Sequence, residues 1–259
     1  MVIPAMAFMS VLEIVLWFFL PAIVAMLLYW TAHMLVAKHA SESTMDAAKW
    51  ASVRVGAIHA LILALAFSGL RAEHNELQEG IDNEALAIEQ LYRGLESFGT
   101  PQAQKIQANL ANYTRLVIEE EWPSMVAGAP LEKADLLVDT IYRQIIELSG
   151  NTNNSGLAST LLNDINDIEN ARGQRSFDID EPISVVFWLI AIVGLILTCV
   201  SFFPTPYSSF RSLFLGMFAG INGLIFFAIS EFSHPFSGVF PTEPTPFVEV
   251  LERTIEAGG

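Results

Sequence analysis

Long apolar stretches and helically spaced apolar stripes alternate along the chain, and together they predict an all-α protein. Four stretches have the length that a helix needs to cross a bilayer core about 30 Å thick. They cover residues 14–37, 51–70, 183–203 and 212–229. The pattern therefore predicts an integral membrane protein with four transmembrane helices, the first of which contains Pro21.

The stretch between the second and third spans has a different pattern, in which apolar residues recur at helical spacing among polar ones. A stripe from Leu77 to Leu95 follows the second span without an intervening proline, which predicts one unbroken helix through both. Three further helices are expected over 106–122, 131–148 and 157–168, with an Asn-rich loop at 150–156. The first of these should end at Trp122, because the residue before a proline is disfavoured in a helix.

This pattern divides the chain into four parts. Residues 1–70 and 183–230 form two transmembrane hairpins, and residues 71–182 form a helical-bundle domain outside the membrane. Residues 231–259 form a Pro-rich tail that a short helix, over 246–255, closes.

Composition strengthens the membrane assignment and limits the possible partners. The chain is 53% hydrophobic and 16% charged, with a mean hydropathy of +0.45, which is too apolar for an ordinary soluble domain. The net charge is −15, and the 71–182 domain holds 20 acidic and 8 basic residues, a net charge of −12. A nucleic-acid partner is not expected, because phosphate backbones are bound by clustered Lys and Arg. Cys199, the single cysteine, excludes an internal disulfide.

The distribution of basic residues predicts an orientation. Four spans place both termini and the acidic domain on one side of the membrane. The short-loop side carries Lys38, Lys49, Arg54 and Arg211, against Arg71, Arg172 and Arg175 on the other. By the positive-inside rule the short loops are cytoplasmic, so the domain and both termini are expected to be extracytoplasmic.

The second span has two contrasting faces. Small residues form one ridge at spacing four that lets another helix approach closely; they are Gly56, Ala60, Ala64 and Ser68. Bulkier candidates for lining a pore lie on a neighbouring face, and they are His59, Leu63, Phe67 and Leu70. Several copies around an axis would make that face a hydrophobic constriction, with His59 as a titratable ring near one mouth. The alternative is ordinary helix packing, with the bulky face meeting lipid or neighbouring helices.

The fourth span carries residues suited to helix packing. Gly216 and Gly220 have GxxxG spacing, and Asn222 follows near mid-membrane, where its amide must find a partner inside the protein. The chain has no HExxH, CxxC or nucleophile-elbow motif, and the acidic run 163–170 lacks the glycine of a calcium loop. A metal site is not expected at the three consecutive acids either. On a helix they point in three directions, so at most one or two could share a cation; they are Glu119, Glu120 and Glu121. We therefore expect no catalytic residue, no metal site, no cofactor and no enzymatic activity.

Three passages resemble a bacterial membrane family described as bestrophin-like. They are AFSGLRAEHNELQEGIDNEALAIEQLYRGL at 66–95, YTRLVIEEEWPSM at 113–125 and HPFSG at 234–238. The resemblance covers most of the chain and implies a homo-oligomeric ion channel in a bacterial inner membrane, a pentamer as in true bestrophins, with the second span lining the pore. It implies chloride as the ion and a cytosolic soluble domain, whereas the acidic domain favours cations and the charge count favours the opposite side.

Two functions stay open on the sequence. One is the oligomeric channel, whose partners are the lipid bilayer, further copies of the chain and inorganic ions. The other is a non-conducting membrane sensor or scaffold, whose acidic bundle binds a ligand or a partner protein.

Overall fold

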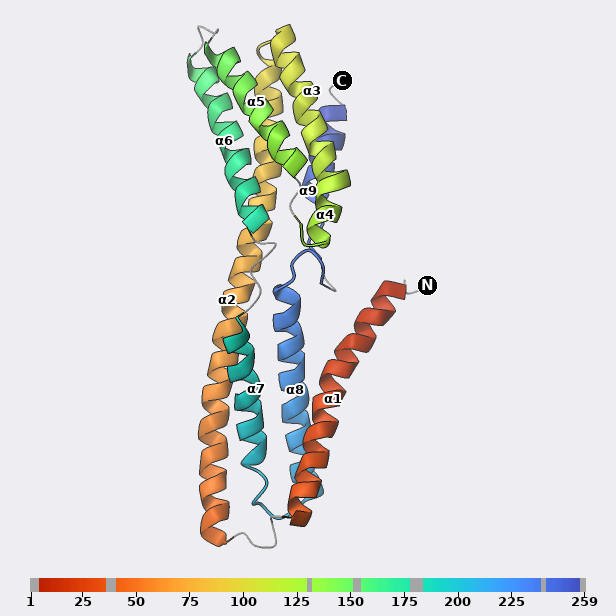
Figure 1. The fold of residues 1–259 in the computed structure, drawn as a ribbon, viewed down its shortest axis with the longest axis vertical. Coiled ribbons are helices and arrows are strands. Elements are labelled where there is room, and N and C mark those ends of the chain that lie inside the picture. The colour runs from red at the N-terminus through yellow and green to blue at the C-terminus, as the bar shows by residue number, and fades with distance from the viewer. Residues whose placement is uncertain are drawn as a thin grey trace. The chain divides into compact units, whose positions relative to one another are not determined.

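The structure, a computed structural model, describes residues 5–35, 41–129, 132–150, 155–177, 184–238 and 241–256, and every regular element in these ranges is helical (Figure 1). The all-α prediction is confirmed. The α-helices are α1 (Ala5–Leu35), α2 (Glu42–Glu96), α3 (Pro101–Leu116), α4 (Trp122–Val126), α5 (Glu132–Gly150), α6 (Ser155–Phe177), α7 (Val185–Val200), α8 (Ser209–Phe232) and α9 (Thr245–Val250). Two π-helices are η2 (Val117–Glu121) and η3 (Leu251–Glu256).

The chain divides into two compact units. The membrane unit comprises Met1–Ala72 and Pro182–Ser233, and the bundle unit comprises Glu73–Glu181 and His234–Gly259. The helix α2 supplies residues to both, and it runs unbroken from Glu42 to Glu96, so the prediction of one continuous helix is confirmed.

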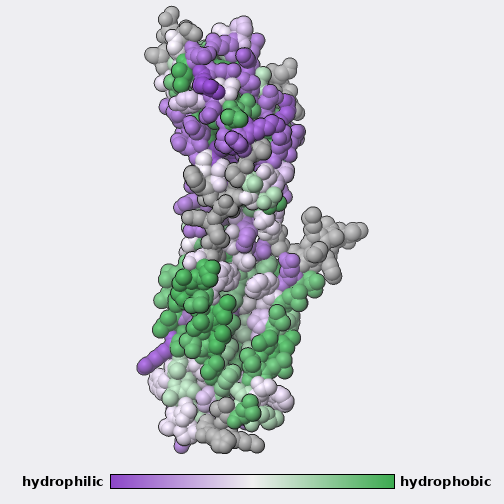
Figure 2. Space-filling view, viewed as in Figure 1, coloured by the Kyte–Doolittle hydropathy of each residue, from purple (hydrophilic) through white to green (hydrophobic). Residues whose placement is uncertain are grey.

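Among the described residues, three helices are long and apolar enough to cross a membrane: α1, α2 and α8. The fourth predicted span, 183–203, is helical from Val185 to Val200, and Ile183 lies outside the described ranges. These 16 residues, none of them charged, rise about 24 Å at 1.5 Å each, which is less than a typical bilayer core. The surface of the membrane unit is largely apolar, in contrast to that of the bundle unit (Figure 2).

Close contact between α1 and α8 holds much of the membrane unit together. A methyl group added at Gly216 would come within 2.7 Å of Met26 Sδ, and one at Gly220 within 2.7 Å of the Phe18 ring. At Gly223 it would come within 1.9 Å of the Trp17 carbonyl oxygen. Glycine is required at this last position because a backbone atom, which cannot rotate away, occupies the space.

The bundle unit has one apolar core formed by stripes from α2, α3, α5 and α6, with α9 added. The α2 stripe from Leu77 to Leu95 is buried, as are Ile141 and Ile165 at the centres of the α5 and α6 stripes. Leu131, expected to begin the α5 stripe, lies outside the described residues. The short C-terminal helix is confirmed and adds Phe247 to this core.

The expected helix end at Trp122 is wrong, because the chain stays helical through η2 and α4 to Val126. In η2 the Trp122 N–H bonds to the Val117 carbonyl, a wider turn than that of an α-helix. The wider turn accommodates Pro123, which lacks an N–H and would clash with the carbonyl four residues earlier in a regular α-helix.

Candidate functional site

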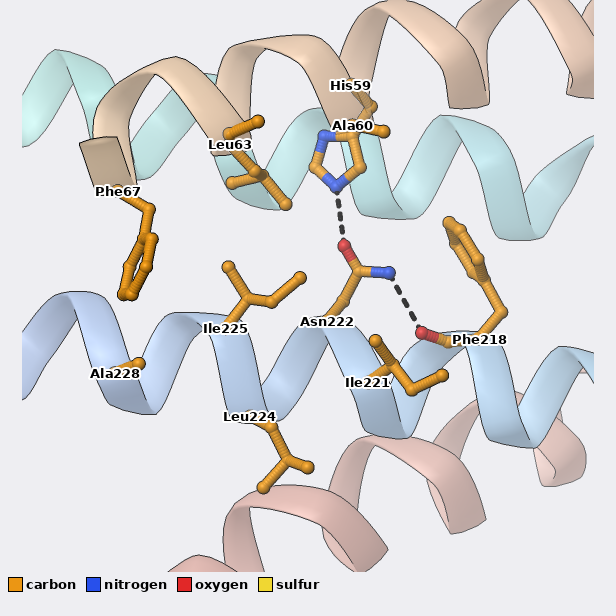
Figure 3. Close-up of a pocket in the computed structure, with 11 residues that line it drawn as sticks. His59, Ala60, Leu63, Phe67, Phe218, Ile221, Asn222, Leu224, Ile225 and Ala228 are labelled. Atoms are coloured by element: carbon orange, nitrogen blue, oxygen red, sulfur yellow. Dashed lines mark hydrogen bonds between the residues drawn. The ribbon is translucent and has the colours of Figure 1, made fainter. Parts of the chain in front are cut away.

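A polar pair joins α2 and α8 inside the membrane unit. His59 Nε2 lies 2.9 Å from Asn222 Oδ1, and both side chains are buried (Figure 3). Asn222 Nδ2 donates to the Phe218 carbonyl at 2.8 Å, one turn earlier on α8. In a bilayer core, which offers no water, this arrangement satisfies an amide that would otherwise be costly to bury.

The hydrogen bonds of Asn222 fix the tautomer of His59. Because the amide nitrogen of Asn222 donates to a backbone carbonyl, its oxygen is the atom that faces the imidazole. His59 Nε2 must therefore carry the hydrogen, and Nδ1 holds the lone pair in the neutral ring. His59 Nδ1 has no hydrogen-bond partner among the described residues, and it faces Gly194 of α7, where an added methyl would lie 2.2 Å away.

An apolar pocket of about 430 Å³ opens beside this pair, between α2 and α8. Figure 3 shows Leu63 and Phe67 of α2 facing Ile225 and Ala228 of α8 across it. The pocket is lined by His59, Ala60, Leu63, Ala64, Phe67, Phe218, Ile221, Asn222, Leu224, Ile225 and Ala228. Its lining suits hydrocarbon, because apart from His59 and Asn222 every lining residue is apolar.

The predicted pore-lining residues separate into two groups. His59 and Leu63 are 3% and 2% exposed within one copy of the chain, so they face its own helices. The expectation of His59 as a titratable ring at a pore mouth stays a prediction. Phe67 and Leu70 are only partly buried, in the cluster that contains Phe226 and Ile229.

The small ridge of α2 lies mostly on the outside. Ala60, Ala64 and Ser68 are exposed, and at Gly56 an added methyl would lie 3.6 Å from Thr198 of α7. This ridge therefore leaves a surface on which a further helix could pack closely.

A second buried site, in the bundle unit, consists of ion pairs. Arg175 binds Glu84 through two parallel contacts, Nε to Oε2 at 2.9 Å and Nη2 to Oε1 at 3.1 Å. Arg175 Nη2 also donates to Glu121 Oε2 at 3.2 Å. The Tyr113 hydroxyl donates to Glu84 at 2.5 Å. All four side chains are at most 1% exposed.

Arg172, one turn before Arg175 on α6, extends this cluster to the surface. It binds Glu121 through Nη1, and its Nε and Nη2 donate to Asp135 Oδ1 at 3.0 and 2.8 Å. Asp135 is the exposed member. Three carboxylates and two guanidinium groups thus leave a net charge of −1, and they join α2, α5, α6 and η2.

Aromatic rings complete the surroundings of Arg175. Its guanidinium carbon lies 5.4 Å from the centroid of the Trp122 ring and 5.6 Å from that of Phe247. Trp122 Nε1 donates to the Thr242 carbonyl at 3.0 Å. The C-terminal residues therefore pack against the ion cluster as part of the bundle unit.

Electrostatics of the cluster follow from burial and pairing. Burial raises the pKa of Tyr113 well above its ordinary value, and the charge of Glu84 raises it further, so the phenol keeps its proton and donates. Burial lowers the pKa of Arg175, but Glu84, Tyr113 and Glu121 together outweigh it, so the pKa is raised overall. Within the described ranges, no group of three or more His, Cys, Asp or Glu side chains could hold a metal ion.

The sequence did not predict this cluster. Glu121 stands in a run of three acids, of which Glu119 is exposed and Glu120 binds Lys133 at 2.7 Å, so only the third enters the core. The available signal was the pair Arg172 and Arg175, which share one face of a helix whose other charges are acidic.

Comparisons with known proteins place the chain in a family. The bestrophin-like domain model matches residues 19–247. A search of curated proteins finds no match. A solved structure of a bacterial bestrophin homologue from Klebsiella pneumoniae is 14% identical, covers 96% of this chain and 97% of its own, and has a TM-score of 0.66. A single-residue variant of that homologue is 15% identical, with coverages of 95% and 97% and a TM-score of 0.67. At this identity the likeness shows the fold, and the family match covers most of the chain, which belongs to the bestrophin-like family.

Proposed function

We propose that the chain forms a homo-oligomeric ion channel in a bacterial inner membrane, with α2 of each copy lining the pore. The observation that carries the proposal is the uncovered face of α2, which lies on the opposite side of the helix from Phe67 and Leu70 and leaves room for neighbouring copies to pack beside it. Its Ile58, Leu61 and Leu65 are 62%, 59% and 65% exposed in a single copy. Membership of the bestrophin-like family, whose namesakes are oligomeric channels, supports the assignment of that face to an assembly around an axis.

Phe67 and Leu70 are the proposed constriction. Both are partly exposed on α2 and packed against the cluster of Phe226 and Ile229, so their positions are fixed from behind. A ring of such side chains gates by excluding water. His59 and Leu63 lie on the same face of α2, nearer its N-terminus, and are buried against α7 and α8.

The proposed ion is a cation. Residues 71–182 carry a net charge of −12, and a vestibule lined by that domain would concentrate cations and repel anions. Chloride, the ion implied by resemblance to true bestrophins, is the competing outcome of the same experiment.

The proposal includes α7 as a fourth crossing. Its 16 residues contain no charged side chain, and apolar residues outside the helix bounds can complete the span. Four crossings put both termini and the bundle on one side of the membrane and the short loops on the other. The short-loop side carries the basic residues at 38, 49, 54 and 211, which favour a cytoplasmic location for it and an extracytoplasmic location for the bundle. Ser159 is exposed on the bundle. A Ser159→Cys variant should react with a membrane-impermeant maleimide on intact cells, and protection until lysis would reverse the orientation.

Purified protein in planar bilayers tests the channel. We expect conductance, with reversal potentials in salt gradients that favour cations, and a larger conductance in Phe67→Ala and Leu70→Ala. Leu213→Ala is the matched control, because Leu213 is 50% exposed on α8 and is not one of the proposed constriction residues. The absence of any protein-dependent conductance over a range of pH values and calcium concentrations would contradict the proposal.

A further inference from the structure

An arginine stacked on an exposed tryptophan marks the start of the apolar part of α2. The Arg54 guanidinium carbon lies 5.8 Å from the centroid of the Trp50 ring. Both side chains are exposed, Trp50 to 67%. Within the described part of the chain, the Arg54 guanidinium has no carboxylate partner, although such a group is costly to leave unpaired at membrane depth.

The direction of the helix explains the stacking. Arg54 lies three residues inside the span predicted to begin at Ala51, a depth of about 4.5 Å along the axis. Side chains of a helix tilt toward its N-terminus. From Arg54, the N-terminal direction along α2 leads out of the apolar layer to the nearer membrane surface. The arginine therefore extends over Trp50, one turn earlier, and reaches the headgroup region, where tryptophan is also enriched.

Charge complementarity identifies what this pair would bind. Lys49 is paired with Asp46 at 2.9 Å, so the opposite charges of these two residues offset each other locally. Arg54 is left as an uncompensated cation whose planar guanidinium can bind two phosphate oxygens at once. Every phospholipid headgroup carries such a phosphate, but only in an anionic lipid does no headgroup cation offset its charge, so an anionic lipid is the better match for Arg54.

We propose that Arg54 and Trp50 form a binding site for the phosphate of an anionic phospholipid headgroup on the short-loop side of the membrane. The guanidinium holds the phosphate, and the indole ring holds the guanidinium in place while its apolar face meets the acyl chains. This site does not depend on the chain being a channel, so its test is separate from the conductance measurement.

Native mass spectrometry of the full-length protein in detergent tests the proposal, with phosphatidylglycerol and phosphatidylcholine as probes. Wild type should retain phosphatidylglycerol in preference to phosphatidylcholine. Arg54→Gln should bind phosphatidylglycerol about fivefold more weakly, the effect expected of one basic residue at a membrane surface. Trp50→Ala should reduce the preference too, because the stack is lost. Arg93→Gln, the same charge change at an exposed site on α2 in the bundle unit, should leave it unchanged.

Several outcomes would overturn the site. They are equal retention of both lipids by wild type, unchanged phosphatidylglycerol binding in Arg54→Gln, or an equal loss in Arg93→Gln. Displacement of the lipid by millimolar inorganic phosphate would instead indicate a site for free anions. Should Arg54→Gln not fold, Arg54→Lys keeps the charge and loses the planar fork, and it should still show weakened preference.

Discussion

Glu84 and Arg175, separated by 91 positions in the sequence, form a two-contact ion pair in the centre of the bundle unit, at 0% and 1% exposure. The pair joins α2 to α6. Glu121 and Tyr113 satisfy further hydrogen-bonding positions of the same groups, so little of the charge is left without a partner. A buried pair of this kind restricts which helices can pack together, because any other register would leave a charge unpaired in the core.

Removing one member of this pair should therefore be severe. We expect Glu84→Gln to cost about 3–5 kcal/mol, because the Arg175 charge stays buried with one fewer carboxylate. The measurement is thermal unfolding of the detergent-solubilised full-length chain, followed by circular dichroism. Lys133→Met, which removes the exposed pair with Glu120, is the control and should cost at most about 1 kcal/mol. Equal effects of the two variants would show that the buried cluster is not a structural anchor.

Asp164 of α6 should make stability depend on pH. Its Oδ2 is buried without a hydrogen-bond partner among the described residues, and burial, with the nearby charge of Asp167, raises its pKa. A raised pKa means that the folded protein holds this proton more tightly than the unfolded chain does. Stability from this group is therefore present at low pH and is lost as pH rises from the ordinary value of about 3.9 through the raised pKa.

Asp164→Asn should remove that loss. The variant should be more stable than wild type at neutral pH, and the difference should disappear in acid. Denaturant midpoints measured across this pH range give the comparison, with Asp139→Asn as the exposed control on α5. A stability difference that does not change with pH would contradict the burial of an uncompensated carboxylate.

The pairing of His59 with Asn222 should be measurable as a coupling energy. We expect a double-mutant cycle of His59→Leu and Asn222→Leu to give about 0.6 kcal/mol, the average for hydrogen bonds between membrane helices, and at most about 1.7 kcal/mol. Thr198→Val is a control, because that hydroxyl donates within its own helix to the Gly194 carbonyl. Additive effects of the two leucine substitutions would rule out a direct interaction.

Gly223 should tolerate no side chain. Its added methyl would lie 1.9 Å from the Trp17 carbonyl, so Gly223→Ala must separate α1 from α8 and lower the thermal stability of the membrane unit. Gly69→Ala on α2 is the matched control, since nothing lies within 4 Å, and it should be neutral or stabilise by up to about 1 kcal/mol. Similar melting points for the two variants would contradict the close α1–α8 approach.

Much of the fold follows from patterns that depend only on neighbouring positions. The α2 stripe from Leu77 to Leu95 and the α6 stripe at Leu161, Ile165 and Ile168 are buried as periodicity predicts. The helix break expected at Pro123 failed because the π-turn of η2 supplies an extra residue, which local propensity does not encode.

The candidate sites were less predictable because they depend on contacts between distant segments. Periodicity places His59 and Leu63 on one face of α2, but it does not tell whether that face meets a pore or the chain's own helices. The partners of Arg175 come from α2, η2 and α4, and no spacing in the sequence relates Glu84 to Met125, whose sulfur lies 3.0 Å from Arg175 Nη1.

Single-particle electron microscopy of the detergent-purified protein tests the central claim most directly, since the claim is that several copies surround an axis with α2 nearest to it. We expect class averages with rotational symmetry, and a map in which the α2 residues Phe67 and Leu70 narrow an axial opening. A monomeric particle, or an assembly in which α1 or α8 lies nearest the axis, would contradict the account.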